Sequence, residues 1–393
     1  MPARTAERGF PDLEYQDRLR KVQAAMAGDG IGIILLTSEH DIRYFSGFLT
    51  QFWQSPTRPW FLLVPADGKP VAVIPQIGAE CMGKTWVEDI RTWPSPHPDD
   101  DGVSLLAGTI AELAGQTPAI GLMKGRETFI RMPLGDFERL RAQFPDAAWR
   151  DVTALLQGMR AVKSEAEIAK IRMACHAASR AFAEVPGLLR RGMSEIEAFR
   201  AFKIACLDEG ADDVAYLVGG AAEGGYGDII SPPSARRLAD GDILILDTGC
   251  VWDGYFCDFD RNFAIGGISD DARAAYETVW AATEAGLEAA RPGTTCADLF
   301  QAMNRVMNGN ETDNSAGGDV GRLGHGLGMQ LTEFPSLTPF DRTVLKPGMV
   351  LTLEPGYAFA PGKMMVHEEN IVVRESCAEL LTTRAPRTMP VIG

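Results

Sequence analysis

The hydrophobic pattern in the first 150 residues alternates between short aliphatic runs and longer segments with helical spacing. Short apolar runs bounded by turn residues predict buried strands, and apolar positions three and four residues apart predict amphipathic helices. The predicted strands lie at residues 31–36, 60–64, 71–74 and 119–122, and the predicted helices at residues 13–27, 104–113 and 133–143. Strands that alternate with helices are typical of an α/β domain.

The second half of the chain has longer helical segments with clear start signals. Ser164-x-x-Glu167 and Ser194-x-x-Glu197 are capping boxes, in which each side chain bonds the backbone at the other position. A further helix is predicted at residues 270–290. The pattern changes near residues 150–163, so we expect two domains, residues 1–155 and 156–393.

Residues 243–263 predict a β-hairpin, because the Asp253-Gly254 pair stands between two apolar runs. Asp247 ends the first run and Asp258 lies on the returning strand, so the hairpin can bring the two carboxylates together. Buried carboxylates are costly unless they are paired or bound to a metal. Two carboxylates that face one pocket repel each other, and a divalent cation removes that repulsion.

The same hairpin has a purely structural interpretation, which stays open from these residues alone. Asp247 would cap a turn, and Asp258 or Asp260 would form an ion pair with Arg261.

Three more candidate ligands follow later in the chain. His325 lies in a glycine-rich stretch, Glu354 follows a predicted strand, and Glu368 precedes another. Oxygen-rich ligation with a single imidazole suits two hard or borderline divalent ions. Such a pair of ions can hold a hydroxide and polarise a carbonyl oxygen.

In the order and spacing of these Asp, Asp, His, Glu and Glu residues, the chain resembles the pita-bread (M24) metallopeptidase family, in its Xaa-Pro aminopeptidase, prolidase and creatinase branch. The resemblance implies an α/β two-domain protein, with a creatinase-type N-terminal α/β domain and a C-terminal pita-bread α+β domain. It implies two divalent metal ions (Mn, Fe, Co or Zn) held by Asp247, Asp258, His325, Glu354 and Glu368.

The implied activity is a metal-dependent hydrolase resembling Xaa-Pro aminopeptidase or prolidase. A hydroxide held by the two metals would attack an amide carbonyl of a short peptide or another small molecule. His325 and Glu354 are the expected catalytic residues, with Glu354 as the group that takes the proton.

The chain departs from the family at several positions. Thr332 and a residue near Ile230 stand where the peptidases carry further histidines, and Val366 stands where prolidases tend to have an arginine. Thr332 keeps a hydroxyl donor, so we expect it to contact substrate. His367 could contact substrate, or act as an acid or base, if it pointed into the cleft, but strand alternation with Glu368 argues that it points away.

These departures motivate two other hypotheses. The enzyme could instead act on a small zwitterionic metabolite, as a creatinase-like or ectoine hydrolase-like C–N hydrolase or as a dimethylsulfoniopropionate lyase does. Trp53, with Phe52 and Trp60, would then form an aromatic box for a cationic group, although packing in a core or a dimer is the alternative. A non-catalytic binding module is the third hypothesis, and the complete ligand set counts against it.

The amino-acid composition limits the kinds of binding partner that we expect. The 393-residue chain has a net charge of −15, which argues against nucleic-acid and anionic-membrane partners. The seven cysteines form no CxxC pair, and no apolar run is long enough to span a membrane, so we expect a cytoplasmic protein with reduced thiols. The glycine-rich segment 216–237 is expected to form a wall facing substrate, and a solvated surface loop is the alternative. The family resemblance also implies a homodimer.

Overall fold

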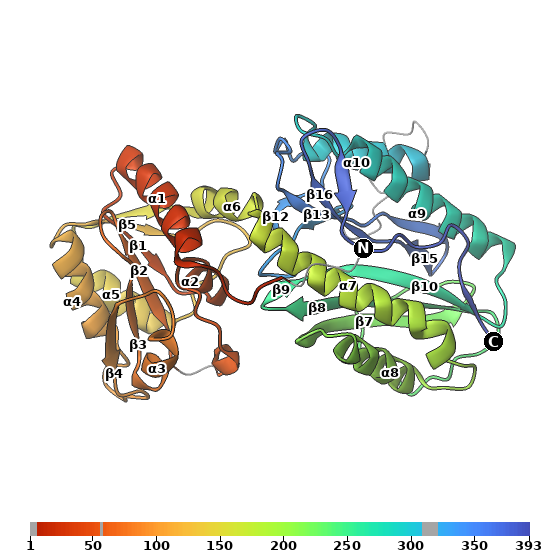
Figure 1. Ribbon diagram of the computed structural model, residues 1–393, viewed down its shortest axis with the longest axis horizontal. Helices are drawn as coiled ribbons and strands as arrows, with labels where there is room; N and C mark the ends of the chain where they lie inside the picture. The colour runs from red at the N-terminus through yellow and green to blue at the C-terminus, as the bar shows by residue number, and fades with distance from the viewer. Residues whose placement is uncertain (1–5, 56–57, 309–320) are drawn as a thin grey trace. The chain divides into compact units, whose positions relative to one another are not determined.

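The computed structural model describes residues 6–55, 58–308 and 321–393. The chain divides into two compact units, one formed by Arg8–Met159 and the other by Arg160–Gly393 together with Glu7 (Figure 1). Each unit has its own sheet system and its own buried core.

The first unit is built on a mixed six-stranded sheet in the order β4-β3-β2-β1-β5-β6. Its strands are β1 (Ile33–Leu36), β2 (Phe61–Pro65), β3 (Val71–Pro75), β4 (Asp89–Trp93), β5 (Ala119–Leu122) and β6 (Ala148–Asp151). The four predicted strands are present. The other two, β4 and β6, form the sheet edges and are largely exposed, so their sequences lack the apolar run that would predict a strand.

Helices flank this sheet, as expected for an α/β domain. They are α1 (Asp12–Asp29), α2 (Glu39–Ser46), α3 (Ala79–Met82), α4 (Val103–Ala114), α5 (Leu134–Gln143) and α6 (Thr153–Ala161), with 3₁₀ turns η1 (Gln51–Gln54) and η2 (Gln76–Gly78). The helix α4 packs on β1, β2 and β4 and against α5, which closes an apolar core around Leu106 and Ile110. Burial of such side chains is the main force that stabilises the unit.

The second unit contains two five-stranded sheets and a small two-stranded sheet. The first, in the order β18-β10-β8-β7, consists of β7 (Asp213–Glu223), β8 (Asp242–Trp252), β10 (Phe259–Ile265) and β18 (Val391–Ile392), with β9 (Tyr255–Phe256) paired to β8. The second, in the order β12-β11-β13-β16-β17, consists of β11 (His325–Gly326), β12 (Glu333–Ser336), β13 (Val350–Leu353), β16 (Glu369–Val373) and β17 (Ala378–Leu380). The small sheet pairs β14 (Gly356–Ala360) with β15 (Lys363–Val366).

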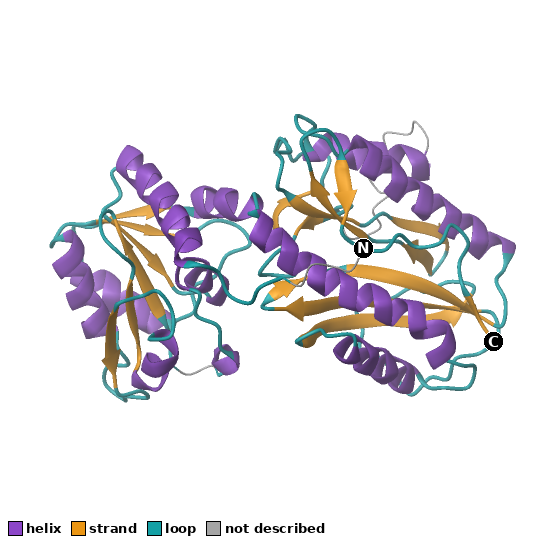
Figure 2. Ribbon diagram, viewed as in Figure 1, coloured by secondary structure: helices purple, strands orange, loops and turns teal. Residues whose placement is uncertain are grey.

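Two pairs of long helices accompany these sheets (Figures 1 and 2). The helices α7 (Glu165–Leu188) and α8 (Glu195–Asp208) pack on the sheet that contains β7 and β8. The helices α9 (Asp270–Ala289) and α10 (Cys296–Asn308) pack on each other, and α9 also packs on β13 and β15. Strands β10 and β16 contact each other, so the two large sheets meet in the interior of the unit.

Local sequence signals explain where these elements begin. Both predicted capping boxes are present, with Ser164 opening α7 and Ser194 opening α8. The hairpin is confirmed as well. Asp253 and Gly254 both adopt positive φ, at 45° and 64°, and they join the paired residues Trp252 and Tyr255. A two-residue turn of this kind matches the twist of the flanking strands.

The register of the hairpin differs from the simplest expectation. Asp247 lies directly opposite Asp260, whereas Asp258 lies in the short break between β9 and β10. Asp247, Asp258 and Asp260 therefore all lie in this part of the fold.

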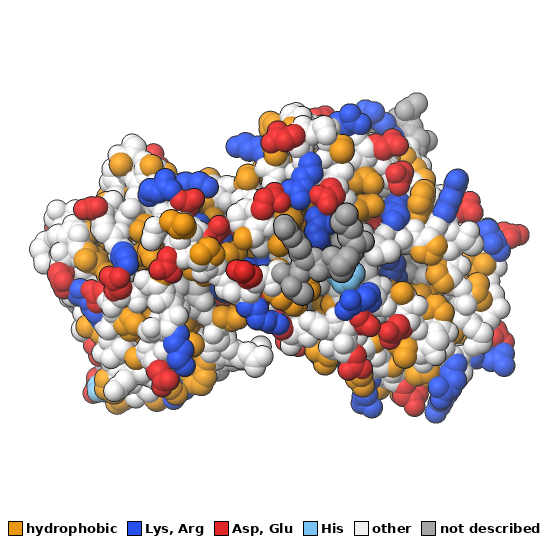
Figure 3. All heavy atoms as spheres, in the orientation of Figure 1, with side chains coloured by type: hydrophobic (Ala, Val, Ile, Leu, Met, Phe, Trp, Pro, Cys, Tyr) orange, Lys and Arg blue, Asp and Glu red, His pale blue; other side chains and the backbone are white. Residues whose placement is uncertain are grey.

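All seven cysteines are free. On the face shown in Figure 3, acidic and basic side chains are interspersed. Among the described residues, no helix is both long enough and apolar enough to cross a membrane.

Candidate metal centre

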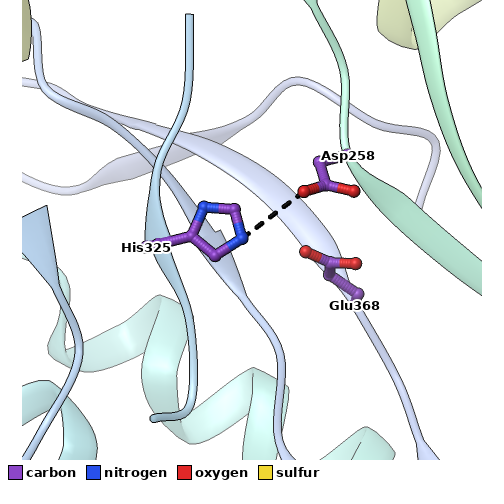
Figure 4. A group of neighbouring side chains, drawn as sticks. All are labelled: Asp258, His325 and Glu368. Carbon is purple, nitrogen blue, oxygen red and sulfur yellow. Dashed lines mark ion pairs between the residues drawn. The ribbon is translucent and has the colours of Figure 1, made fainter. Parts of the chain in front are cut away.

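Three of the predicted ligands converge at one point in the second unit (Figure 4). Asp258, His325 and Glu368 each offer a ligand atom, and these atoms lie within 4.8 Å of one another. His325 Nε2 is 3.4 Å from Asp258 Oδ2. All three residues are buried, with 4%, 3% and 2% of their surface exposed. An enclosed group of two carboxylates and one imidazole is a donor set that divalent transition metals favour.

Asp258 is held in place by Asn370, the last residue of the His-Glu-Glu-Asn stretch. The backbone N–H of Asp258 donates to Asn370 Oδ1 at 2.9 Å, and Asn370 Nδ2 donates back to the carbonyl oxygen of Asp258. Asn370 lies on β16, two residues after Glu368. This pair of bonds joins the end of the hairpin to β16, the strand that directly follows Glu368.

The orientation of His325 follows from its backbone. Its Nδ1 lies 2.8 Å from the carbonyl oxygen of Gly326. Because a carbonyl only accepts, Nδ1 carries the proton and Nε2 presents a lone pair to the cluster. Gly324 adopts a φ of 138°, and a Cβ there would lie 2.3 Å from the carbonyl oxygen of Thr352. The glycine before His325 thus allows β11 to approach β13 closely.

The other two predicted ligands lie beside this cluster. Glu354 Oε2 is 4.0 Å from His325 Nε2, and the Glu354 side chain is 20% exposed. Asp247 lies on β8, where its Oδ1 is buried and has no hydrogen-bond partner in the described parts of the chain. Burial raises the pKa of Tyr216, on the neighbouring strand β7, and the negative charges of Asp247, Asp258 and Glu368 raise it further, so this side chain lies near the cluster. All five predicted ligands therefore belong to one region of the second unit.

The electrostatics of the cluster favour a bound cation. Burial raises the pKa of Asp247, Asp258 and Glu368 well above the usual carboxyl range, and the negative charges of neighbouring carboxylates raise those of Asp247 and Glu368 further. Glu368 Oε1, like Asp247 Oδ1, has no hydrogen-bond partner among the described residues. Unpaired buried oxygens of this kind are costly. A divalent ion would satisfy both oxygens and offset the repulsion, so the residues fit such an ion.

The structural interpretation of the hairpin is wrong on one point. Among the described residues, Arg261 forms no ion pair with Asp258 or Asp260, although it donates to the backbone carbonyl oxygen of Asp260. It forms its ion pair with Glu369, at 3.0 Å from Nη2 to Oε2, and donates to the carbonyl oxygen of Glu368 at 2.9 Å. Asp260 is only 1% exposed, and burial raises its pKa. Arg261 therefore supports the backbone at Glu368 and Glu369 rather than forming an ion pair with the aspartates.

The two expected substrate contacts in this unit have different surroundings. The Thr332 hydroxyl lies 3.5 Å from Nη2 of Arg322. His367 is 1% exposed, and its Nδ1 lies 3.3 Å from the hydroxyl of Thr283 on α9. Burial lowers the pKa of His367 to about 3, so the imidazole is neutral. This placement argues for packing rather than substrate contact, as strand alternation suggested. Ile230 is 75% exposed.

The aromatic box around Trp53 belongs to the core of the first unit. Trp53 and Trp60 are 8% and 1% exposed, with ring centroids 5.7 Å apart. The guanidinium of Arg131 lies 5.1 Å from the Trp53 ring, and that of Arg58 lies 5.2 Å from the Phe52 ring. The chain's own arginines occupy positions that a cationic ligand would need, so these aromatics are packed as structural residues.

Sequence reasoning missed three residues near the cluster. Asn370 and Arg322 had no assigned role, and Tyr216 was named only as the start of the glycine-rich wall. A signal existed for Asn370, because it lies only two residues after Glu368 in the His-Glu-Glu-Asn stretch. The positions of Tyr216 and Arg322 depend on strand pairing and loop packing, which have no local sequence signature.

Comparison with known proteins agrees with this geometry. Residues 169–375, more than half of the chain, match Metallopeptidase family M24. The chain belongs to metallopeptidase family M24. Residues 18–162 match the Creatinase/Prolidase N-terminal domain. The family and the two-domain fold predicted from the ligand order are thus confirmed.

Similar M24 proteins cover nearly the whole chain. A probable dipeptidase PepE from Mycobacterium tuberculosis is 29% identical over 387 residues, 98% of each chain. An Xaa-Pro dipeptidase from Lactobacillus delbrueckii is 28% identical, covering 88% of this chain and 90% of its own. The crystal structure of dipeptidase PepE from Mycobacterium ulcerans is 27% identical with a TM-score of 0.83, covering 98% and 99% of the two chains.

These findings distinguish between the three functional hypotheses as far as the class of enzyme is concerned. The protein is a metal-dependent hydrolase of the M24 family. Its relatives are dipeptidases and Xaa-Pro dipeptidases, which favours the peptidase hypothesis over action on a zwitterionic metabolite and over a binding module.

Proposed function

We propose that this M24 enzyme is an Xaa-Pro dipeptidase that uses two divalent ions, Mn, Fe, Co or Zn. The observation that carries the proposal is the buried convergence of Asp258, His325 and Glu368, with Asp247 and Glu354 beside them. The names of the relatives supply the substrate class, which is a short peptide with proline after the scissile bond.

The five residues would have two roles, metal binding and proton transfer. Asp247, Asp258, His325, Glu354 and Glu368 would hold the ions. Bound divalent ions polarise a carbonyl oxygen and lower the pKa of a water. The Glu354 side chain is 20% exposed, against 6% for Asp258 and 4% for His325, and Asp247 is half-buried as well. We assign to Glu354 the role of receiving a proton from the attacking water and passing it to the leaving nitrogen, as the family resemblance implies.

Elemental analysis of the purified protein, combined with a dipeptide panel, tests the proposal. We expect about two metals per chain and cleavage of Xaa-Pro dipeptides in preference to Xaa-Ala dipeptides. Asp258→Ala should lose metal and activity, whereas Asp271→Ala, at an exposed position on α9, should lose neither. A well-folded protein that binds no metal, or that cleaves no Xaa-Pro peptide when loaded, would contradict it.

We further propose that residues 1–155 and 156–393 are folding domains and that the enzyme is a cytoplasmic homodimer. The family resemblance supports the two domains and the homodimer, and the seven scattered cysteines without a CxxC pair support the cytoplasmic location. Sedimentation analysis should give twice the 42.6 kDa chain mass, and a monomer at micromolar concentration would contradict the homodimer.

A further inference from the structure

The first unit contains a cavity of about 350 Å³ that the proposed metal chemistry does not use. It lies between the loop that follows β5, the helix α5 and the strand β6, and all ten residues that line it belong to the first unit. Small-molecule sites in proteins usually have volumes of about 300 to 1,000 Å³. The cavity therefore has room for a ligand the size of a small aromatic ring system.

Three aromatic side chains form much of the cavity wall. Phe137 on α5 and Trp149 on β6 pack edge to face, with ring centroids 5.6 Å apart. Phe129, in the loop after β5, also lines the cavity and is 55% exposed. A ligand that covers this ring removes apolar surface from water, and aromatic ligands can also pack edge to face or offset against such rings. The wall therefore suits an aromatic ligand.

The loop that carries this wall is held in place by hydrogen bonds. The backbone N–H groups of Lys124 and Gly125 donate to Thr153 Oγ1 at 3.0 Å and 2.8 Å. The Thr128 hydroxyl donates to the carbonyl oxygen of Gly125 at 2.7 Å. A wall that is already fixed loses little conformational freedom when a ligand binds, so more of the contact energy appears as affinity.

The charged side chains at the cavity are both cations, those of Lys124 and Arg141. The Lys124 ammonium donates to the carbonyl oxygen of Trp149 at 3.1 Å, and the Arg141 guanidinium lies 6.0 Å from the Trp149 ring. Among the described residues, neither cation forms an ion pair and no acidic side chain lines the cavity. The nearby Asp151 accepts from Thr153 and from the backbone N–H of Lys124. In a chain with a net charge of −15, this local excess of positive charge fits an anion.

We propose that the cavity binds a small aromatic anion, a ring that carries one carboxylate or phosphate group. The ring packs against Phe129, Phe137 and Trp149. The anionic group lies beside Lys124 and Arg141, where the guanidinium can donate two parallel charge-assisted hydrogen bonds to it. None of the five candidate metal ligands lines the cavity, so this ligand is distinct from a substrate held at the metal centre.

Isothermal titration calorimetry on the full-length protein tests the proposal with three matched probes. These are 2-naphthoate, 2-naphthyl phosphate and the neutral 2-naphthamide. We expect at least one of the anions to bind about 10-fold more tightly than the amide, the range of a charged hydrogen bond, and the tighter anion shows which headgroup the site takes. Arg141→Gln should weaken binding of that anion about 10-fold and leave the amide unchanged. Phe129→Ala should weaken binding of the anions and the amide alike.

Two control variants locate the binding. Arg150→Gln removes the same charge from an exposed position on β6, next to Trp149 but outside the cavity lining, and should leave all affinities unchanged. Asp258→Ala alters the proposed metal centre and should bind the anion as the wild type does. Thermal unfolding should show that each variant keeps its fold, as expected for Arg141 and Phe129 because both are exposed.

Three outcomes would overturn the proposal. Equal affinity for the anions and the amide would show that the cations contribute nothing. Anion binding that survives Arg141→Gln but is lost in Asp258→Ala would place the probe at the metal centre. The third is the absence of binding by any probe at millimolar concentration. None of these results depends on whether the enzyme cleaves Xaa-Pro dipeptides, so this proposal and the proposed function stand or fall separately.

Discussion

At the scale of single residues, the site is a group of buried acids whose charges have few partners in the protein itself. Asp247 Oδ1 and Glu368 Oε1 have no hydrogen-bond partner among the described residues, and Asp260 lies opposite Asp247 in the ladder. Like charges directly opposite on paired strands are destabilising. Natural sequences keep such costly arrangements where function requires them, and here the requirement is a bound cation.

The proton-transfer role of Glu354 predicts a large kinetic effect. Glu354→Gln keeps the shape of the side chain but removes its basicity, so kcat on Leu-Pro should fall about 100-fold or more. Steady-state kinetics with parallel elemental analysis measures this, because one lost ligand could also lower metal occupancy. Glu375→Gln, at an exposed position, is the matched control. Wild-type turnover in a fully loaded Glu354→Gln protein would refute the role.

The bonds between Asn370 and Asp258 predict a role in metal affinity. Asn370→Ala removes both hydrogen bonds that orient Asp258, and loss of such a support typically weakens metal binding about 10- to 100-fold. Competition with a chelating dye would measure the dissociation constant. Unchanged affinity would show that the backbone alone positions Asp258.

At the scale of elements, the second unit brings its ligands together by joining three local structures. The hairpin supplies Asp247 and Asp258, the glycine-flanked strand β11 supplies His325, and β16 follows Glu368. A buried ion cluster anchors the loop after β11. Glu333 accepts from Arg160, at 2.5 Å, and from Lys163, at 3.2 Å. This cluster fixes the segment that contains Thr332.

The ion cluster predicts a defined pH dependence of stability. Burial raises the pKa of Glu333, but the charges of Arg160 and Lys163 outweigh burial and lower it to about 2, from a usual value of 4.5. A carboxyl whose pKa is lower in the folded state stabilises the fold above its unfolded pKa and loses that effect as pH falls. Glu333→Gln should therefore cost about 3 kcal/mol above pH 4.5, and the difference should shrink towards pH 2.

Urea unfolding of wild type and Glu333→Gln between pH 2 and pH 7 would measure this difference. Glu165→Gln, whose side chain is 77% exposed, should change stability little at any pH. A constant difference between wild type and Glu333→Gln across the range would show that the glutamate contributes by packing rather than by its charge.

At the scale of the whole molecule, the acid cluster should couple metal binding to folding. The carboxyls of Asp247, Asp258 and Glu368 have raised pKa values in the metal-free fold. Groups whose pKa is higher in the folded state stabilise the fold at low pH and lose that contribution as pH rises. Metal-free protein should therefore gain stability on mild acidification from pH 8. Metal-loaded protein should lose stability over the same range, because protons compete with the ions for the ligands.

Thermal unfolding with and without Mn²⁺ between pH 5 and pH 8 would test whether the stabilities of the metal-free and metal-loaded protein change in opposite directions with pH. Bound metal should raise the unfolding temperature in a concentration-dependent way at pH 8. Parallel pH profiles for the two forms would contradict the coupling.

The sequence by itself determined the features that depend on local chemistry. The capping boxes at Ser164 and Ser194, the turn at Asp253-Gly254 and the buried strands follow from side-chain preferences and apolar spacing over a few residues. The edge strands β4 and β6 were not predicted, because they are largely exposed and their sequences contain no apolar run. The order of the five candidate ligands was sufficient to identify the family, which the match over residues 169–375 confirms.

Only the tertiary structure decided which of these side chains meet. Asp260 lies opposite Asp247 because of the strand register, and Asn370 reaches Asp258 across 112 positions of sequence. The same is true of Trp53, whose ring is covered by Arg131 from a distant segment. Such contacts depend on how whole strands and loops pack, and packing brings together residues whose local sequences hold no information about one another. In the same way, only the fold places the Arg322 guanidinium 3.5 Å from the Thr332 hydroxyl.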